Sequence, residues 1–307
     1  MADQREDILD SMRSRVLRGL QSGTLQAGDR LPSARALERE LEVDHRVILD
    51  VYRELSAEGL IETRPRGGVY VAARHARGGI PPLPERWFAD VLAEGVAREI
   101  PVPDLSEWLR RCTETLRLRA VVITTTADQS AGLCRELRDD FGLEAESVPV
   151  TAIAARPFVV PVRRADLIVT TGAHRKSVED LATEAKKPAI AIDVRLDIMG
   201  GEWRLLLQRP VYAIVGSEEF ATMLHRFVQD TPGSENLRTI IVGQDDFAAI
   251  PSDAPTYVTQ EARRLLGDRP LPGRLIPAAR TIAQHSAREI IRFIVGANRD
   301  AMARTTK

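Results

Sequence analysis

The chain has 307 residues, of which 43 are basic and 44 acidic, and 44% are apolar. That length suits two or three domains, and the apolar content is ordinary for a protein with a packed core. Because the net charge is close to zero, bulk charge does not predict nucleic-acid binding, and no apolar run is long enough to span a bilayer.

The first predicted element is a helix over residues 8–20. Its apolar residues recur every four positions and form one stripe, at Ile8, Met12, Val16 and Leu20. The segment 21–23 is a plausible helix stop, and Gly28-Asp29 predicts a turn.

Two short helices follow the turn. Ser33 can cap the free N–H groups of the first of them, and Leu37 and Leu41 face inward. Asp44 is a good N-cap for the next helix, whose inward face carries Ile48, Val51, Tyr52 and Leu55.

A hairpin with a basic tip comes next. Residues 60–63 and 69–71 alternate enough to pair as antiparallel strands. Glycines at the tip permit positive φ and a close approach to DNA, and arginines pair with phosphate oxygens. The tip residues are Arg64, Arg66, Gly67 and Gly68.

This order is the layout of a winged helix-turn-helix. The segments 28–37, 52–61 and 64–71 resemble, in order and spacing, the DNA-binding domain of the GntR family of bacterial transcription regulators. The resemblance covers roughly the first quarter of the chain. It implies that Arg35, which lies in the first turn of the second helix, touches DNA.

Recognition helices read bases with residues near their N-terminus, so His45 and Arg46 are the best candidates for base contacts. An arginine there can hold guanine with two hydrogen bonds, which is worth ~1–3 kcal/mol of discrimination. Many family members have an arginine and two threonines at these places, with another arginine further on. This chain has His45, Arg46, Val47 and Leu49 instead, which leaves the operator sequence open.

Leu49 could touch a thymine methyl group, whereas Val47 is expected to pack in the domain. The predicted DNA-binding residues are Ser33, Arg35, His45, Arg46, Leu49, Arg64, Arg66, Gly67 and Gly68.

A glycine- and proline-rich linker at residues 74–84 separates this domain from the rest. Helices predicted over 87–100 and 108–116 either pack the DNA-binding domain against the next domain or pair two subunits. We therefore expect a DNA-binding domain at 1–75, a linker and connecting helices at 76–117, and a sensing and dimerisation domain at 118–307.

The third region alternates apolar strands with helices, which predicts a parallel α/β sheet. Strands are expected at 121–123, 145–150, 166–170 and 188–193, and then at 211–215, 237–242 and 255–259. The second run repeats the order of the first, which suggests a duplication, and a last helix over 278–303 could return across both units.

The expected fold is therefore an N-terminal winged helix-turn-helix followed by a two-lobed α/β domain. Two lobes with a crossing C-terminal segment loosely resemble the periplasmic-binding-protein-like sensor domains of other bacterial regulators. A single five-stranded flavodoxin-like domain with an extension is the alternative.

Ligands of open α/β sheets bind beyond the carboxyl ends of the strands. Helix capping alone explains each polar residue there taken singly, but together they predict a site for a small polar or anionic effector. The candidate residues are Thr124, Thr126, Asp128, Thr170, Thr171, Gly172, His174, Asp193, Arg195, Ser217 and Glu218.

The sequence thus predicts a cytoplasmic, homodimeric regulator that binds a pseudo-palindromic double-stranded operator and a small-molecule effector. No catalytic residue, cofactor, metal or membrane contact is expected. The strand at 121–123 is followed by no dinucleotide-binding glycine motif, and the five histidines lack metal-ligand spacing. The alternatives are a C-terminal domain that is catalytic or that only dimerises, and regulation by a partner protein.

Overall fold

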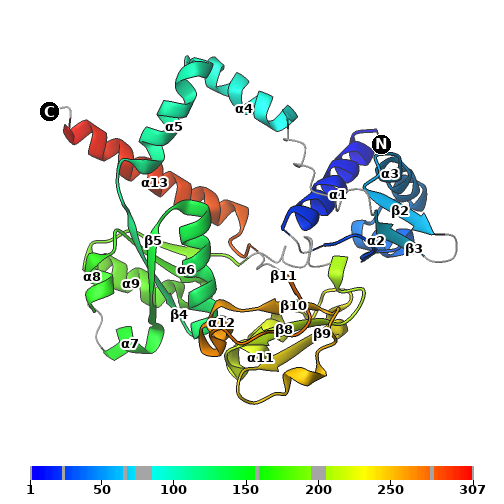
Figure 1. The fold of residues 1–307 in the computed structure, drawn as a ribbon. Helices are drawn as coiled ribbons and strands as arrows, with labels where there is room; N and C mark the ends of the chain where they lie inside the picture. The colour runs from blue at the N-terminus through cyan, green and yellow to red at the C-terminus, as the bar shows by residue number, and fades with distance from the viewer. Residues whose placement is uncertain are drawn as a thin grey trace. The chain divides into compact units, whose positions relative to one another are not determined.

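The computed structural model describes residues 2–22, 25–64, 68–72, 85–155, 159–194, 205–276 and 280–305. The chain forms two compact units (Figure 1): the first comprises Met1–Pro81 and Leu196–Ala279, the second Pro82–Arg195 and Arg280–Lys307. The α/β region is therefore divided between the units, each of which contains one parallel sheet. The domain ranges 1–75, 76–117 and 118–307 remain a prediction.

The winged helix-turn-helix expected at the N-terminus is present in the first unit. Its helices are α1 (Ala2–Ser22), α2 (Ala34–Leu41) and α3 (His45–Ala57). Its antiparallel sheet has the order β1-β3-β2, from β1 (Arg30–Leu31), β2 (Ile61–Arg64) and β3 (Gly68–Val71). The sequence had not predicted β1, which consists of only two residues.

The rest of the first unit is a parallel α/β lobe, residues 205–276, which we call the C-lobe. Its strands are β8 (Val211–Val215), β9 (Leu237–Ile241), β10 (Pro255–Val258) and β11 (Arg274–Ile276). Buried residues of α11 (Glu218–Val228) and α12 (Gln260–Leu266) belong to two different core clusters, so the helices cover opposite faces of the sheet. The sequence had not predicted β11.

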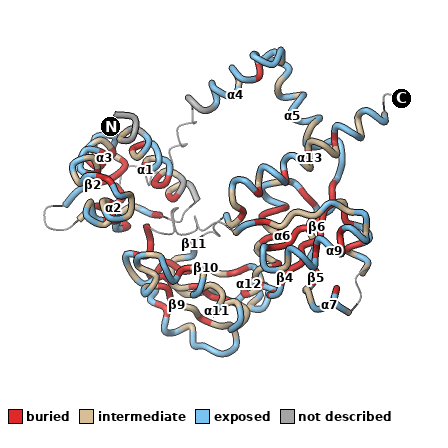
Figure 2. The backbone as a smooth tube through the Cα atoms, turned by 180° about the vertical axis from the view of Figure 1, so that it is seen from behind, coloured by how far each residue is buried: buried red, intermediate tan, exposed pale blue. Residues whose placement is uncertain are grey.

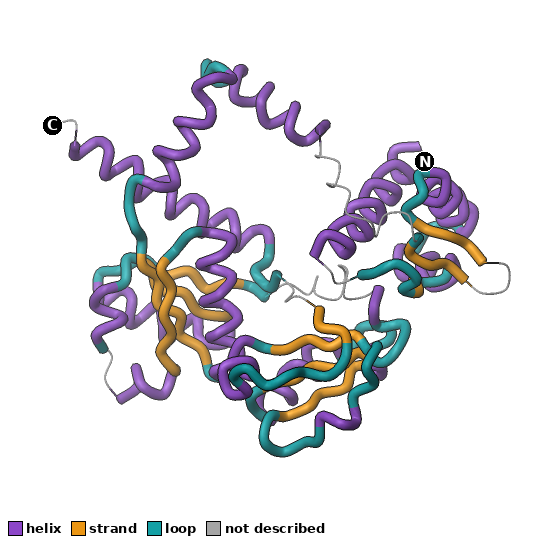
Figure 3. Tube along the Cα trace, viewed as in Figure 1, coloured by secondary structure: helices purple, strands orange, loops and turns teal. Residues whose placement is uncertain are grey.

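The second unit contains the other parallel lobe, which we call the N-lobe. Its strands are β4 (Arg119–Thr124), β5 (Glu144–Pro149), β6 (Leu167–Thr171) and β7 (Ala189–Ile192). One face packs against α6 (Ala127–Phe141) and α13 (Gln284–Thr305), and the other against α7 (Val150–Ala155), α8 (Val160–Arg164) and α9 (Arg175–Ala185). Figure 3 shows the helices on both sides of the strands.

The two sheets have the same topology. In each, the first strand in sequence lies between the second and the third, giving β5-β4-β6-β7 in the N-lobe and β9-β8-β10-β11 in the C-lobe. All neighbouring strands in both sheets are parallel. Two separate four-stranded sheets confirm the two-lobed expectation, and the single five-stranded alternative is wrong.

The last helix begins later than predicted, at Gln284 instead of residue 278. The backbone N–H groups of Thr281 and Ile282 donate to the buried carboxylate of Glu136, at 2.8 and 2.9 Å. Ile282 also forms an antiparallel bridge with Val194. These long-range bonds hold the segment extended, although its residues would suit a helix.

Two helices of the second unit, α4 (Glu85–Ala97) and α5 (Leu105–Glu114), form what we call the helical arm. Most described residues of the arm are exposed, as Figure 2 shows. Its end is fastened where α5 packs along α13 and the buried Asn298 accepts the N–H of Leu116 at 2.7 Å. No helix in the part of the chain that the structure describes is both long and apolar enough to cross a membrane.

Candidate functional site

Capping residues place the two helices of the helix-turn-helix. The Ser33 hydroxyl accepts the N–H of Ala36 at 3.2 Å, and the Asp44 carboxylate accepts the N–H of Arg46 at 2.7 Å. Both helices therefore begin directly after the caps that the sequence predicted.

Tyr52 connects α3 to the start of α2. Its hydroxyl donates to the carbonyl oxygen of Pro32 at 2.6 Å, and its side chain is buried. Burial raises the pKa of Tyr52, so the hydroxyl keeps its proton and stays a donor. The bond fixes the recognition helix relative to the helix before it.

The arginines of this domain differ in whether an acid neutralises them. Five of the described ones form ion pairs, with the partners Arg5–Glu54, Arg13–Glu58, Arg15–Glu40, Arg53–Asp50 and Arg64–Glu62. Arg35 and Arg46 are exposed, and neither guanidinium has a carboxylate partner among the described residues. Their charges are therefore available to phosphate or guanine.

Other predicted residues of the recognition helix are also near its start. His45 uses Nδ1 to bond Glu38 of α2 at 3.0 Å, which leaves Nε2 for any base contact. Leu49 is 43% exposed, so its side chain can reach a thymine methyl group. Val47 packs against the apolar core, as expected.

The wing carries the remaining predicted residues. Arg64 bonds Glu62 through Nε at 3.0 Å and lies over the ring of Tyr70, so it is held on the hairpin itself. Gly68 begins β3 with a φ of 107°, a conformation that favours glycine. Arg66 and Gly67 lie outside the described residues.

Arg30 is a candidate that sequence reasoning missed. It is exposed in β1, directly opposite Tyr70 of the wing, and it has no carboxylate partner in the described part of the domain. A β-carbon placed on Gly68 would lie 3.5 Å from its Nε, so the guanidinium lies beside the wing backbone. The only local signal was an arginine after Gly28-Asp29, in a segment interpreted as a turn.

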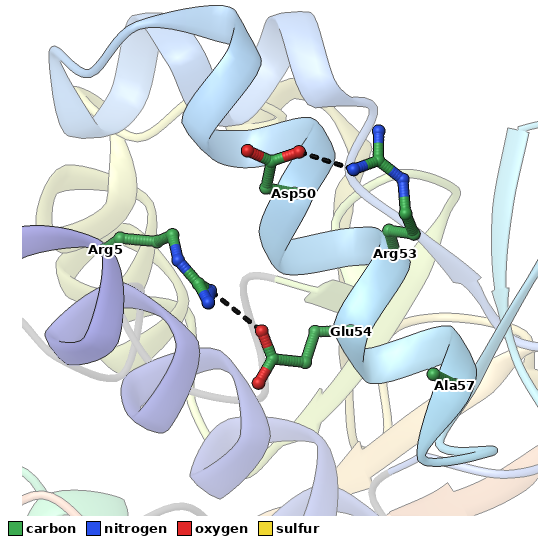
Figure 4. A pocket seen from close by; sticks show the side chains of 5 residues that line it. All are labelled: Arg5, Asp50, Arg53, Glu54 and Ala57. Carbon is green, nitrogen blue, oxygen red and sulfur yellow. Dashed lines mark hydrogen bonds and ion pairs between the residues drawn. The ribbon is translucent and has the colours of Figure 1, made fainter. Parts of the chain in front are cut away.

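A pocket of about 380 Å³ lies on the DNA-binding domain between α1 and α3 (Figure 4). Its charged side chains bond one another: Arg5 donates to Glu54 at 2.8 Å, and Arg53 donates to Asp50 at 2.6 Å. None of its lining residues belongs to the predicted effector site. Because its charged side chains already bond one another, this pocket is a poor candidate for a ligand site.

The N-lobe brings together most of the predicted effector residues. In the order β5-β4-β6-β7, the strand order reverses between β4 and β6, because the chain adds β5 on one side of β4 and then β6 on the other. Open α/β sheets bind ligands at such a point. The loops after these strands touch, because Thr125 Oγ1 and His174 Nε2 share a hydrogen bond of 2.7 Å.

Several of these polar groups are already satisfied within the lobe. Thr126 caps α6 by accepting the N–H of Gln129, Thr124 shares a 2.5 Å bond with Ser130, and Thr170 donates to the carbonyl of Ile123. Asp128 is buried in the first turn of α6. Helix capping and local hydrogen bonds therefore account for these residues, in agreement with the capping explanation that the sequence offered for each residue singly.

Thr171 differs from these residues. Its side chain is 6% exposed at the end of β6, and its hydroxyl forms no hydrogen bond with any described residue. Gly172 follows it at the start of a short 3-10 turn. Because no described residue engages this hydroxyl, Thr171 is the predicted effector residue most open to a ligand at this edge.

Asp193 follows β7 at the same edge. Its carboxylate bonds His285 Nε2 at 2.7 Å and lies 4.0 Å from the guanidinium of Arg175. Its backbone N–H donates to the buried Ser286 at 3.0 Å. His285, Ser286 and Arg175 were not predicted, and His285 comes from a segment far along the chain that carries no local signal.

The other predicted effector residues are elsewhere. Ser217 and Glu218 lie at the carboxyl end of β8 in the C-lobe, where Ser217 caps α11 by accepting the N–H of Phe220 at 3.2 Å. Arg195 lies outside the described residues. Among the residues with described positions, no three His, Cys, Asp or Glu side chains are grouped as metal ligands.

Comparison with known proteins identifies the N-terminal domain. Residues 10–71 match the model of the family described as bacterial regulatory proteins, gntR family. Over 65 residues the chain is 35% identical to the HTH-type transcriptional regulator Rv1152 of Mycobacterium tuberculosis, covering 21% of this chain and 54% of that protein.

A second relative is the vitamin B6 salvage pathway transcriptional repressor PtsJ of Salmonella typhimurium. It is 30% identical over 116 residues, which cover 36% of this chain and 25% of the repressor. The chain therefore spans about half the length of the first relative and a quarter of the second. A solved GntR family transcriptional regulator from Listeria monocytogenes matches 35% of this chain and 92% of its own, at 23% identity and a TM-score of 0.30.

Proposed function

We propose that this chain, whose residues 10–71 are a GntR-family helix-turn-helix domain, is a transcription regulator that binds double-stranded operator DNA. The observation that carries the proposal is the trio of exposed arginines without carboxylate partners among the described residues: Arg30, Arg35 and Arg46. They lie beside the wing, at the start of α2 and at the start of the recognition helix. This distribution suits phosphate contacts flanking a helix in the major groove.

We infer that the regulator acts as a homodimer joined through the helical arm. Phe88, Trp108 and Leu109 of the arm are 45%, 51% and 57% exposed. Large apolar side chains left exposed in this way often mark an interface. A second copy is the natural occupant, because helix-turn-helix proteins read two half-sites about one helical turn apart.

The second part of the proposal is a small polar or anionic effector bound at the strand ends of the N-lobe. Thr171 supports it with a hydroxyl that no described residue engages, and Arg175, His174 and His285 can supply positive or donor groups there. Ser217 and Glu218 stay a separate prediction for the strand ends of the C-lobe. We place the protein in the cytoplasm, with its DNA.

DNA binding is tested by selecting duplexes from a random library with the purified chain and titrating the selected duplex by gel shift. Enrichment of a pseudo-palindrome supports the proposal, and the absence of any enriched duplex contradicts it. Arg13→Ala serves as a control, because that arginine is already neutralised by Glu58.

Effector binding is tested by thermal-shift screening against a metabolite library, followed by calorimetry with and without the selected duplex. Thr171→Val and Asp128→Ala should weaken a hit if the N-lobe edge is the site. A ligand whose affinity is the same for both variants and the wild type binds elsewhere. A ligand whose affinity is the same with and without DNA binds without signalling. A ligand that is converted into a product would favour the catalytic alternative. If no ligand binds, the remaining roles of the lobes are dimerisation and regulation by a partner protein.

A further inference from the structure

Asp29 is a buried carboxylate where the DNA-binding domain meets the C-lobe within the first unit. Its Oδ1 accepts from Arg209 at 2.6 Å, and its Oδ2 accepts from Arg274 at 3.0 Å. The same Oδ2 accepts the backbone N–H of Gln26 at 2.8 Å, which closes the turn before β1. One side chain, 3% exposed, therefore holds both its own turn and two arginines of the C-lobe.

The charges at this junction depend on one another. A carboxylate buried this deeply is very unfavourable without cationic partners. Burial lowers the pKa of Arg274, and the nearby Asp29 opposes that shift, so the arginine also depends on the acid. Arg209 is the more exposed member, with a side chain 37% accessible.

Apolar packing accompanies the ion pairs. Leu25, four residues before Asp29, belongs to one core cluster with Leu205, Leu206 and Leu207 of the C-lobe. All four side chains are buried. The junction is thus a continuation of the core, and it is not a loose surface contact.

Asp29 is also bonded to the wing through its backbone. Its carbonyl accepts the N–H of Val71 at 2.9 Å, and the N–H of Gly28 donates to the carbonyl of Val71 at 2.9 Å. The next residue, Arg30, points outward beside Gly68. A shift of Asp29 must therefore move both β1 and β3, and with them Arg30.

We propose that Asp29, held by Arg209 and Arg274, couples the position of the C-lobe to the DNA-reading wing. A change in the C-lobe that displaces the two arginines shifts β1 and the wing together. Allosteric coupling in proteins is typically ~5- to 150-fold in affinity, which sets the expected effect on DNA binding. The proposal goes beyond effector binding and requires no particular effector.

Hydrogen exchange tests the mechanical half of the proposal. In the Arg209→Ala/Arg274→Ala protein, the amides of Gly28 and Val71 should exchange at least ~5-fold faster than in the wild type, while the β8 amides stay protected. The matched control is Arg264→Ala, since that exposed C-lobe arginine forms its ion pair with Glu261 on its own helix. Unchanged exchange at Gly28 and Val71 in the double variant would overturn the proposal.

DNA affinity tests the functional half, by fluorescence anisotropy with a labelled non-specific duplex at low salt. Asp29→Asn keeps an oxygen for the N–H of Gln26 but loses the charge that holds the arginines. It and the double arginine variant should each change affinity at least ~5-fold in the same direction, and their combination should add nothing further. Wild-type affinity in both, or additive effects, would overturn the coupling. Neither measurement uses an effector, so failure of the effector proposal leaves both outcomes interpretable.

Discussion

Arg46 and Arg64 belong to the same predicted DNA-binding surface, yet their guanidinium groups have different surroundings. Arg46 has no carboxylate partner among the described residues, whereas Arg64 bonds Glu62 and lies over Tyr70. We expect Arg46→Ala to relax preference at one base pair, at a cost of ~1–3 kcal/mol in discrimination. Arg64→Ala should change discrimination less, because its charge is already engaged. Gel-shift titration on duplexes changed one base pair at a time measures both, and equal effects would contradict the distinction.

Arg30 should act as a phosphate contact. We expect Arg30→Ala to weaken binding to all duplexes alike and to lower the salt slope by about one ion. The measurement is affinity against salt concentration for a selected and an unrelated duplex, with Arg13→Ala as the neutralised-arginine control. A wild-type slope for Arg30→Ala would remove it from the interface.

The two cysteines should differ in reactivity. Burial raises the pKa of Cys134 to about 11, whereas Cys112 lies half-buried on α5. Because the thiolate is the reactive form, Cys134 should resist labelling at pH 8 and become reactive only as pH approaches 11 or the N-lobe unfolds. Mass spectrometry after maleimide labelling of the native protein counts the sites, with Cys112→Ser as control. Rapid double labelling at pH 8 would show that Cys134 is not protected.

At the scale of elements, the recognition helix depends on its cap. Asp44→Ala removes the acceptor for the N–H of Arg46, and such a loss typically costs ~1 kcal/mol. Amide exchange in α3 should then be about fivefold faster, since 1.4 kcal/mol corresponds to tenfold. Asp50→Ala is the control, because Asp50 lies on α3 without capping it. Equal exchange in both variants would mean that the cap is dispensable.

The sequence predicted those elements whose signal is local. The apolar runs of β4 and β8 and the caps of α2 and α3 are readable because neighbouring residues determine them. Two short strands, β1 and β11, carry too few residues for a periodic pattern. The predicted start of the last helix was wrong because Glu136, which is distant in sequence, holds Thr281 and Ile282 in an extended conformation.

The candidate sites divide in the same way. Arg35 and Arg46 could be predicted because they lie within a motif of fixed spacing. Neither the bond of His285 to Asp193 nor that of Arg209 to Asp29 could be predicted, since each joins residues brought together only by tertiary structure. An ion pair also changes what a predicted DNA-binding residue can do, as the neutralised Arg64 shows.

At the scale of the whole molecule, subunit pairing decides whether two half-sites can be read together. The arm exposes Trp108 and Leu109 on α5, the helix that packs along α13. Truncating or charging large apolar anchors is what most weakens interfaces. We therefore expect Trp108→Glu/Leu109→Glu protein to be monomeric at micromolar concentration, and we expect the wild type to be a dimer there with or without reductant.

Leu265→Glu is the control, because it places a glutamate on an apolar residue of α12 that is 48% exposed, away from the arm. Light scattering should give the wild-type mass for this control and half that mass for the arm variant. The arm variant should also bind a duplex with two half-sites no more tightly than a duplex with one, because monomers lose the gain in effective concentration that linked DNA-binding domains share. An arm variant that stays dimeric would place the dimer interface elsewhere. A wild type that is monomeric at these concentrations would contradict the dimer. A wild-type dimer lost on reduction would instead assign pairing to a disulfide.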